Sequence, residues 1–380
     1  MVSVLTGIDV LLSRRLDLVA GRRAGLISNA SGVTRDLVSN VDALLGALGV
    51  QLVALFGPEH GFYAAAADTA AVGSTRDRRT GLSVYSLYGE VYKLTAEMLT
   101  GLDVLVFDIQ SVGVRFYIYI TTLLYAMQAA AEQGLPFVVC DRPNPIGGEG
   151  VEGPVLEPGF ESFVGPGCLP IRYGMTVGEL SRLYNKVWGV GRDLTVVPCD
   201  GWRREMWFDD TGLVWVPPSP GIPKLDTATV YPGTCLIEGT NLSEGRGTAL
   251  PFEVVGAPWV EGWQLAEALN ELGLPGVRFR PVQFEPTASK WAGQRCGGVQ
   301  LYVLDRRAFR PVNAGLNLVA TVKALYPESF TWRLPHFDRL MGTDRVRAQL
   351  DAGVPAGQIA ASWSDSHTTF ETQRREVLLY

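Results

Sequence analysis

The stretch Gln51-Leu-Val-Ala-Leu-Phe-Gly-Pro-Glu-His-Gly61 joins an apolar run to a tight turn. The run has the composition of a buried strand, and the glycine and proline that follow it favour a turn. In an open α/β sheet, ligands bind outside the carboxyl ends of the strands. The sequence therefore predicts that Glu59 and His60 face such an edge, although a solvated turn would carry the same residue types.

Strand-like and helix-like segments alternate through the first 145 residues. Apolar runs predict strands at 24–28, 51–56, 104–108 and 137–140, and helices at 41–48, 96–99 and 121–133. Strands that are apolar throughout and separated by helices indicate a parallel sheet covered on both faces. We expect a Rossmann-like arrangement in topology only, because no G-x-G-x-x-G motif opens a helix after a strand.

Polar residues stand at the end of each predicted strand. They are Asn29-Ala-Ser31-Gly32, Glu59-His60, Asp108-Ile-Gln110 and Asp141-Arg142. The carboxyl ends of parallel strands share one edge of a sheet, so these side chains are predicted to converge. Taken singly, Asp108 would also fit a helix cap, and Asp141 with Arg142 would fit a local ion pair. Together they favour a binding or catalytic site.

The second half of the chain predicts a smaller α+β domain. Thr176 and Glu179 form a capping-box pattern before a helix at 177–187. A further strand is predicted at 234–237, followed by the polar segment Glu238–Thr248. Beyond it, helices are expected at 262–272, 313–325, 344–352, 355–364 and 369–379, and strands at 277–281 and 299–303. We place the domains at 1–245 and 246–380.

Length and composition exclude several classes of protein. A chain of 380 residues exceeds the size of one hydrophobic core, and 47% apolar with 19% charged residues indicates a globular protein. The net charge of −6 argues against a nucleic-acid partner. We expect neither a signal peptide nor a membrane-spanning helix. Five scattered cysteines without a C-x-x-C pair predict no zinc site and a cytoplasmic location, and nothing indicates an oligomeric state.

Carboxylate acid/base chemistry fits these residues best. The chain lacks the G-x-S-x-G motif of serine hydrolases, and one histidine near the predicted edge is too few for a metal site. Glycoside hydrolysis uses two carboxyl groups, and Glu59, Asp108, Glu238 and Glu244 are the candidates. Aromatic runs such as 116–119 would suit stacking on sugar rings, although core packing explains most of them. No metal and no other cofactor is predicted.

Several motifs resemble one known family. The runs LFGPEHGF (55–62), DRPNPIGGEGVEGP (141–154) and YPGTCLIEGTNLSEGRGT (231–248) resemble the exo-β-N-acetylmuramidases of the NamZ type, in matching order over nearly the whole chain. The resemblance implies a Rossmann-like domain, a smaller second domain and an active site in the cleft between them. It also implies hydrolysis that releases terminal N-acetylmuramic acid from the non-reducing end of peptidoglycan fragments, a small carbohydrate substrate.

The family's motifs assign roles to residues of this chain. We expect Glu59 to be the general acid and His60 to orient it, with Glu244 ranked above Asp108 and Glu238 as the second carboxylate. One of the three arginines Arg246, Arg142 and Arg115 is expected to bind the lactyl carboxylate of muramic acid. The remaining candidates are substrate-binding, and the set comprises Asn29, Gln110, Arg115, Asp141, Arg142, Asn144, Glu238, Asn241 and Arg246.

Four positions depart from the family's pattern. They are Tyr63 (followed by an alanine run), Ser111, Tyr173 and Gly221. These departures keep two alternatives open: a carbohydrate-binding protein without turnover, and a hydrolase of another acidic or N-acetylated sugar. Because Glu59, His60 and the segment 238–246 match the family, an active hydrolase is the favoured interpretation.

Overall fold

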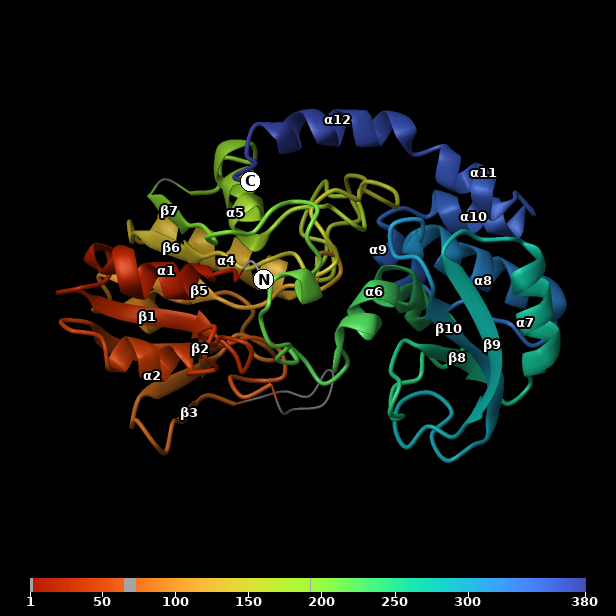
Figure 1. Ribbon diagram of the computed structural model, residues 1–380, viewed down its shortest axis with the longest axis horizontal. Helices are drawn as coiled ribbons and strands as arrows, with labels where there is room; N and C mark the ends of the chain where they lie inside the picture. The colour runs from red at the N-terminus through yellow and green to blue at the C-terminus, as the bar shows by residue number, and fades with distance from the viewer. Residues whose placement is uncertain (1–2, 65–72, 192) are drawn as a thin grey trace.

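The structure is a computed structural model that describes residues 3–64, 73–191 and 193–380. Most of the alanine run after Tyr63 lies outside these ranges. Two units lie side by side in Figure 1, each built around its own sheet. The first sheet has seven strands in the order β3-β4-β2-β1-β5-β6-β7, and the second has three in the order β8-β10-β9. The α/β class and the Rossmann-like first unit are therefore confirmed.

The first sheet is parallel except at one edge. Its parallel strands are β1 (Arg23–Ser28), β2 (Gln51–Gly57), β4 (Ser83–Ser86), β5 (Val104–Asp108), β6 (Phe137–Cys140) and β7 (Leu194–Val197). The short β3 (Thr75–Arg76) runs antiparallel to β4. All of β5 and β6 is buried, which explains why their apolar runs predicted them. The half-buried β4 and β7 carry mixed residues and were not predicted.

Helices cover both faces of this sheet, as continuous apolar strands require. On one face lie α1 (Gly7–Arg14) and α2 (Asn40–Leu45), packed with Leu26 and Val106. On the other lie α4 (Tyr119–Glu132) and α5 (Val177–Lys186), packed with residues such as Phe107. The short α3 (Ala96–Leu99) precedes β5. The predicted capping box of α5 is present, because Thr176 Oγ1 accepts from Glu179 N and Glu179 Oε2 accepts from Thr176 N.

The second unit combines an antiparallel sheet with helices. Its strands are β8 (Val254–Ala257), β9 (Val277–Phe284) and β10 (Cys296–Val303). Its helices are α6 (Leu225–Thr234), α7 (Gly262–Glu271), α8 (Pro311–Leu325), α9 (His336–Met341), α10 (Arg345–Asp351) and α11 (Ala356–Ala361). α6 crosses α8 where two glycines meet: a Cβ on Gly315 would lie 2.2 Å from the carbonyl oxygen of Gly233. The predicted boundary at residue 245 stays a prediction.

The strand predicted at 234–237 is wrong. These residues end α6 and begin a 3₁₀ helix, Cys235–Gly239. α6 is buried along residues 227–234, and a helix buried on all sides has the same continuous apolar pattern as a buried strand. Glu238 therefore follows a helix end, and neither it nor Glu244 leaves a strand of either sheet.

The last helix joins the two units. α12 (Ser364–Arg375) starts beside α11 and reaches across the top of Figure 1 to the first unit, near α5. It begins and ends earlier than the predicted 369–379. The residues after it lie against the first unit, where Leu379 N donates to Glu179 Oε1 at 2.9 Å and Tyr380 Oη to Asp141 Oδ2 at 2.7 Å.

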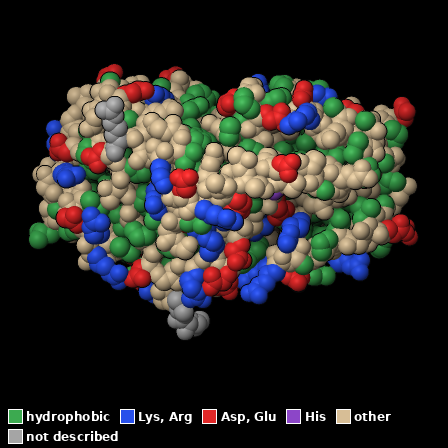
Figure 2. Space-filling model, turned by 90° about the horizontal axis from the view of Figure 1, so that it is seen from above, with side chains coloured by type: hydrophobic (Ala, Val, Ile, Leu, Met, Phe, Trp, Pro, Cys, Tyr) green, Lys and Arg blue, Asp and Glu red, His purple; other side chains and the backbone are tan. Residues whose placement is uncertain are grey.

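Two features of the molecule concern a charged binding face and a membrane span: the distribution of its surface charge and the length of its helices. In Figure 2, acidic and basic side chains are interspersed over the face seen from above, with no broad area of one sign. Among the helices of the described ranges, none combines the length and the apolar character needed to cross a membrane.

Candidate active site

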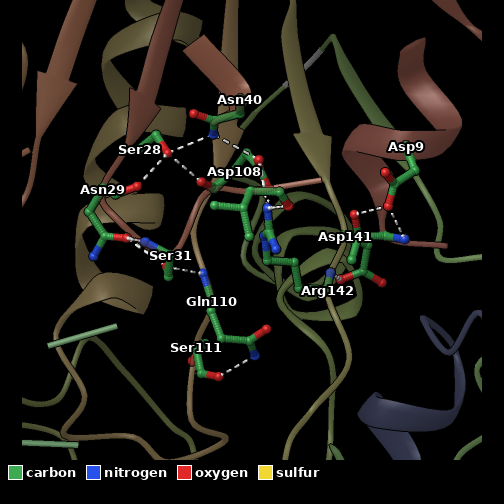
Figure 3. A network of polar contacts seen from close by, with 12 residues as sticks. Asp9, Ser28, Asn29, Ser31, Asn40, Asp108, Gln110, Ser111, Asp141 and Arg142 are labelled. Atoms are coloured by element: carbon green, nitrogen blue, oxygen red, sulfur yellow. Dashed lines mark hydrogen bonds and ion pairs between the residues drawn. The ribbon is translucent and has the colours of Figure 1, made fainter. Parts of the chain in front are cut away.

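The carboxyl edge of the first sheet is organised around a buried ion pair. Asp108, at the end of β5, is inaccessible to solvent, and its two oxygens accept from Arg142 Nε at 2.6 Å and Nη2 at 2.9 Å. Asn40 Nδ2 donates to the same carboxylate at 2.8 Å, and Ser28 Oγ donates to the Asp108 backbone oxygen at 2.8 Å (Figure 3). These contacts place Asp108 and Arg142 together as predicted, but they use the carboxylate to hold the edge of the sheet.

Asn29 and Gln110 connect this edge to the loops above it. Asn29 Oδ1 accepts from Ser31 N and Oγ, whereas its Nδ2 donates to the carbonyl oxygen of Pro218 at 2.9 Å. Gln110 Nε2 donates to the carbonyl oxygen of Pro143 at 2.9 Å. Ser31 Oγ accepts from Gln110 N (Figure 3). Both predicted site residues therefore position the loops that cover the edge.

Asp141 is a buried acceptor beneath the edge. Its carboxylate accepts from Gly178 N and Thr176 Oγ1, both at 2.7 Å, from Tyr380 Oη and from the backbone N–H of Arg142. Burial raises the pKa of Asp141 to about 7, although the hydrogen bonds from Tyr380 and Thr176 act in the opposite direction. This residue therefore joins the end of β6 to α5 and to the last residues of the chain.

Three predicted binding residues serve the backbone instead. Arg115 is fully buried and donates to the carbonyl oxygens of Pro154, Leu169 and Leu340, which ties the two units together. Asn144 Nδ2 donates to Met175 O, and its Oδ1 accepts from Ile146 N. Asn241 Nδ2 donates to Ser329 O, and its Oδ1 accepts from Thr331 N. Buried polar groups require such partners, which accounts for these residue types without a ligand.

Glu59 and His60 lie on a strained turn after β2. His60 has a φ of 67°, a left-handed conformation that is uncommon outside glycine, and Gly61 follows with 74°. A Cβ on Gly57 would lie 2.6 Å from Phe62 N, so the turn requires glycine there. Strain of this kind persists only where the surroundings fix it, and it clusters at functional sites. The Glu59 side chain is 14% exposed and its Oε2 lies 4.0 Å from His60 Nε2.

Tyr117 lies between this turn and the second unit. Burial raises the pKa of its phenol, and the charge of Glu59 adds to that rise. Tyr117 Oη donates to Ser219 Oγ at 3.0 Å, and its ring lies 6.1 Å from that of Tyr231 in α6. Tyr117 therefore contacts the loop at 218–221 and α6, and its phenol lies within the electrostatic influence of Glu59.

The segment 238–246 forms a charged cluster in the second unit. Glu238 Oε1 accepts from Arg246 Nε at 3.0 Å and Nη2 at 2.8 Å, and Glu238 Oε2 lies 3.8 Å from His336 Nε2. Burial acts to raise the pKa of Glu238, but Arg246 and His336 outweigh it and lower the pKa to about 2. Glu238 is therefore ionised throughout the physiological range and cannot donate a proton.

Glu244 lies deeper in the same cluster. Its side chain is 2% exposed, its Oε2 lies 2.8 Å from Lys290 Nζ and its Oε1 lies 3.5 Å from Arg246 Nε. The Arg246 guanidinium stands over the ring of Phe252, at 4.8 Å from its centroid. A Cβ on Gly221 would lie 3.1 Å from Arg246 Nη1, which places this cation against the loop that also contacts Tyr117.

Two of the four altered positions are in contact with each other. Ser111 Oγ and Tyr173 Oη lie 3.2 Å apart in a hydrogen bond, so two departures from the family pattern are partners of each other. Tyr63 Oη donates to Asp77. Gly221 leaves room for the Arg246 guanidinium.

Sequence reasoning missed Lys290, Tyr117, Ser219 and His336 as members of the candidate site. Lys290 and Ser219 lie in irregular loops, where no periodic pattern indicates which side chain turns inward. Tyr117 belongs to an aromatic run that core packing explains equally well. No group of three or more His, Cys, Asp or Glu that could hold a metal ion occurs in the part of the chain that the structure describes.

Comparison with known proteins assigns the family. The family model for the N-terminal part of exo-β-N-acetylmuramidase NamZ matches residues 24–226, and that for its C-terminal part matches residues 229–380. The chain belongs to the NamZ family. Within that family, it is 49% identical over 378 residues to the peptidoglycan β-N-acetylmuramidase NamZ of Bacillus subtilis (strain 168), covering 99% of this chain and 91% of that protein.

Solved structures agree with the NamZ assignment of the fold. A DUF1343 family protein from Bacteroides fragilis superimposes with a TM-score of 0.93 at 38% identity over 100% of both chains. A second DUF1343 family protein from the same organism gives 0.81 at 30% identity, over 100% of this chain and 99% of the other.

Proposed function

We propose that this NamZ family member is an exo-acting glycoside hydrolase that releases terminal N-acetylmuramic acid from the non-reducing end of peptidoglycan fragments. The observation that carries the proposal is the Glu59-His60 pair, held on a strained turn at the carboxyl edge of the first sheet. The 49% identity to a peptidoglycan β-N-acetylmuramidase supports the substrate class. The active site would lie where the two units meet.

Glu59 is the proposed general acid. Its side chain is shielded but still partly exposed, as a group that protonates a leaving oxygen must be. His60, at 4.0 Å, would orient the carboxyl group. Glu238, which its neighbours keep ionised, is proposed to stabilise the positive charge that develops in an oxocarbenium-like transition state. All three carboxylates are in ion pairs, but the Glu238 side chain is 20% exposed, whereas those of Glu244 and Asp108 are almost inaccessible. We therefore rank Glu238 above Glu244 and Asp108, which reverses the order expected from the sequence.

Arg246 is the proposed receptor for the lactyl carboxylate that distinguishes muramic acid from glucosamine. Of the three arginines, Arg115 donates its hydrogen bonds to backbone carbonyl oxygens, and Arg142 is paired with Asp108. Arg246 retains 19% exposure and is kept in place by Glu238 and Phe252. A planar guanidinium binds a carboxylate through two parallel hydrogen bonds, which gives both affinity and orientation.

The test is product analysis on defined glycans. The protein is incubated with a disaccharide that carries N-acetylmuramic acid at its non-reducing end, and with the isomeric disaccharide that carries N-acetylglucosamine there. We expect free N-acetylmuramic acid from the first and no cleavage of the second. In longer strands, release from the end only is expected. Cleavage within strands, or no cleavage of either disaccharide, would contradict the proposal.

A cytoplasmic location is the last part of the proposal. The five cysteines are unpaired, and four of them are buried, which suits a reducing compartment.

A further inference from the structure

Lys290 lies in the charged cluster but outside every motif that identifies the family here. Its ammonium donates to the carbonyl oxygens of Ile237 at 2.9 Å and Thr240 at 3.0 Å, and it pairs with Glu244 at 2.8 Å. The two carbonyl oxygens accept hydrogen bonds from the ammonium, whereas its contact with Glu244 Oε2 is an ion pair without hydrogen-bond geometry. Burial lowers the pKa of Lys290, whereas Glu244 acts to raise it. The charged form of Lys290 is therefore stabilised by Glu244.

The loop that carries Lys290 is strained on both sides of it. Ser289 and Trp291 have φ values of 66° and 63°, which non-glycine residues rarely adopt. The surroundings fix this conformation: Trp291 Nε1 donates to Asn241 O at 2.7 Å, and Thr287 N donates to Gly247 O at 2.9 Å. Two contacts on the segment 238–248 thus clamp the loop so that Lys290 points at Glu244.

Glu244 stands between two cations. Its Oε2 faces Lys290 at 2.8 Å, and its Oε1 faces Arg246 Nε at 3.5 Å. Arg246 is closer to Glu238, with 2.8 and 3.0 Å to one oxygen. Lys290 therefore balances the charge of Glu244, and Arg246 stays paired with Glu238. In this position, the Arg246 guanidinium lies beside Phe252 and Gly221.

We infer that Lys290 is a positioning residue for specificity: by holding Glu244, it keeps Arg246 directed toward the substrate's carboxylate. This inference rests on the proposed function, in which Arg246 binds that carboxylate. Without Lys290, Glu244 is a buried carboxylate whose nearest cation is Arg246. Because an unpaired buried charge is costly, Arg246 is expected to move from Glu238 toward Glu244.

The test compares Lys290→Met with Lys323→Met. Lys323 is a matched control in the same unit, because its ammonium also meets a carbonyl oxygen and a carboxylate, those of Leu350 and Asp351, each at 3.4 Å. Calorimetry measures the affinity of each protein for N-acetylmuramic acid and for N-acetylglucosamine, and kinetics on the muramic acid disaccharide give kcat and KM.

We expect the Lys290→Met variant to bind N-acetylmuramic acid about tenfold or more weakly, the loss typical of one misplaced contact to a charged group. Affinity for N-acetylglucosamine, which lacks the lactyl carboxylate, should stay unchanged. KM should rise with kcat nearly constant, because the contact is remote from the reacting bond. Lys323→Met should leave both affinities unchanged. Equal loss for both sugars, or a fall in kcat alone, would overturn the inference.

If Lys290→Met does not fold, a double variant provides the test instead. Glu244→Gln with Lys290→Met removes both buried charges, so Arg246 stays with Glu238 and discrimination between the two sugars should be kept. Loss of discrimination in the double variant would contradict the inference. A wild-type protein that binds both sugars equally would overturn the role of Arg246 and this inference together. If the wild type prefers N-acetylmuramic acid over N-acetylglucosamine and the Lys290→Met variant keeps that preference, only the inference about Lys290 is overturned.

Discussion

Tyr380 is expected to contribute to stability in a manner that depends on pH. Its hydroxyl donates to Asp141 Oδ2 and accepts from Cys199 N, both at 2.7 Å. Tyr380→Phe removes both hydrogen bonds and leaves the Cys199 N–H without its acceptor. A hydrogen bond to a charged group and an unsatisfied buried donor together correspond to about 2–4 kcal/mol of unfolding free energy.

The pH dependence follows from the pKa of Asp141. Burial raises this pKa from 3.8 to about 7 in the folded state, so the folded state holds the proton more tightly than the unfolded state does. The stability that Asp141 contributes is therefore complete below the unfolded pKa and is lost as the pH rises through about 7. The Tyr380 hydrogen bond lowers this pKa, so its removal makes the ionised carboxylate still less stable in the folded state.

Urea unfolding at two pH values provides the assay. The loss caused by Tyr380→Phe should be larger by about 1–2 kcal/mol at about pH 8.5 than at about pH 5.5, because only the ionised carboxylate accepts a charge-assisted bond. Tyr302→Phe is the control, since Tyr302 is exposed and its hydroxyl donates to Gln300 Oε1, a side chain that carries no charge. An equal loss at both pH values, or a loss no greater than that of the control, would refute the reasoning.

Two further substitutions test the packing of each unit. Asp108→Asn leaves Arg142 buried without its carboxylate, and thermal unfolding should show a loss of about 3–5 kcal/mol; an unchanged melting temperature would contradict the role given to this pair. Gly233→Ala places a methyl group 1.9 Å from the carbonyl oxygen of Pro311 and should separate α6 from α8 or prevent folding. Gly357→Ala in α11, where nothing lies within 4 Å, should leave the melting temperature unchanged or raise it, and equal effects of the two substitutions would count against the packing argument.

In the first sheet, burial decided which strands the sequence could predict. β5 and β6 are buried along their whole length, and their apolar runs matched the observed bounds. β4 and β7 are half-buried and gave no such run. The run at 234–237 is buried in a helix, where continuous apolar character does not separate helix from strand.

The candidate site was predictable only in part. The polar residues at the sheet edge could be predicted, because Asp108 and Asp141 stand at the ends of strands that their apolar sequences indicate. The partners of these residues were not, since Asp108 meets Asn40 and Asp141 meets Tyr380 across 68 and 239 positions. The buried state of Arg115 also gave no local signal, because its acceptors are backbone carbonyls, which every residue has.

The most direct test of the central claim compares two leaving groups in the Glu59→Gln variant. The variant keeps the size of the side chain but cannot titrate. Hydrolysis of the muramic acid disaccharide should slow about 10²–10⁴-fold, the usual contribution of a general acid. Hydrolysis of the 4-nitrophenyl β-glycoside of N-acetylmuramic acid should slow far less, because 4-nitrophenolate leaves without a proton. Near wild-type rates on the disaccharide, or equal losses on both substrates, would contradict the assignment of Glu59 as the general acid.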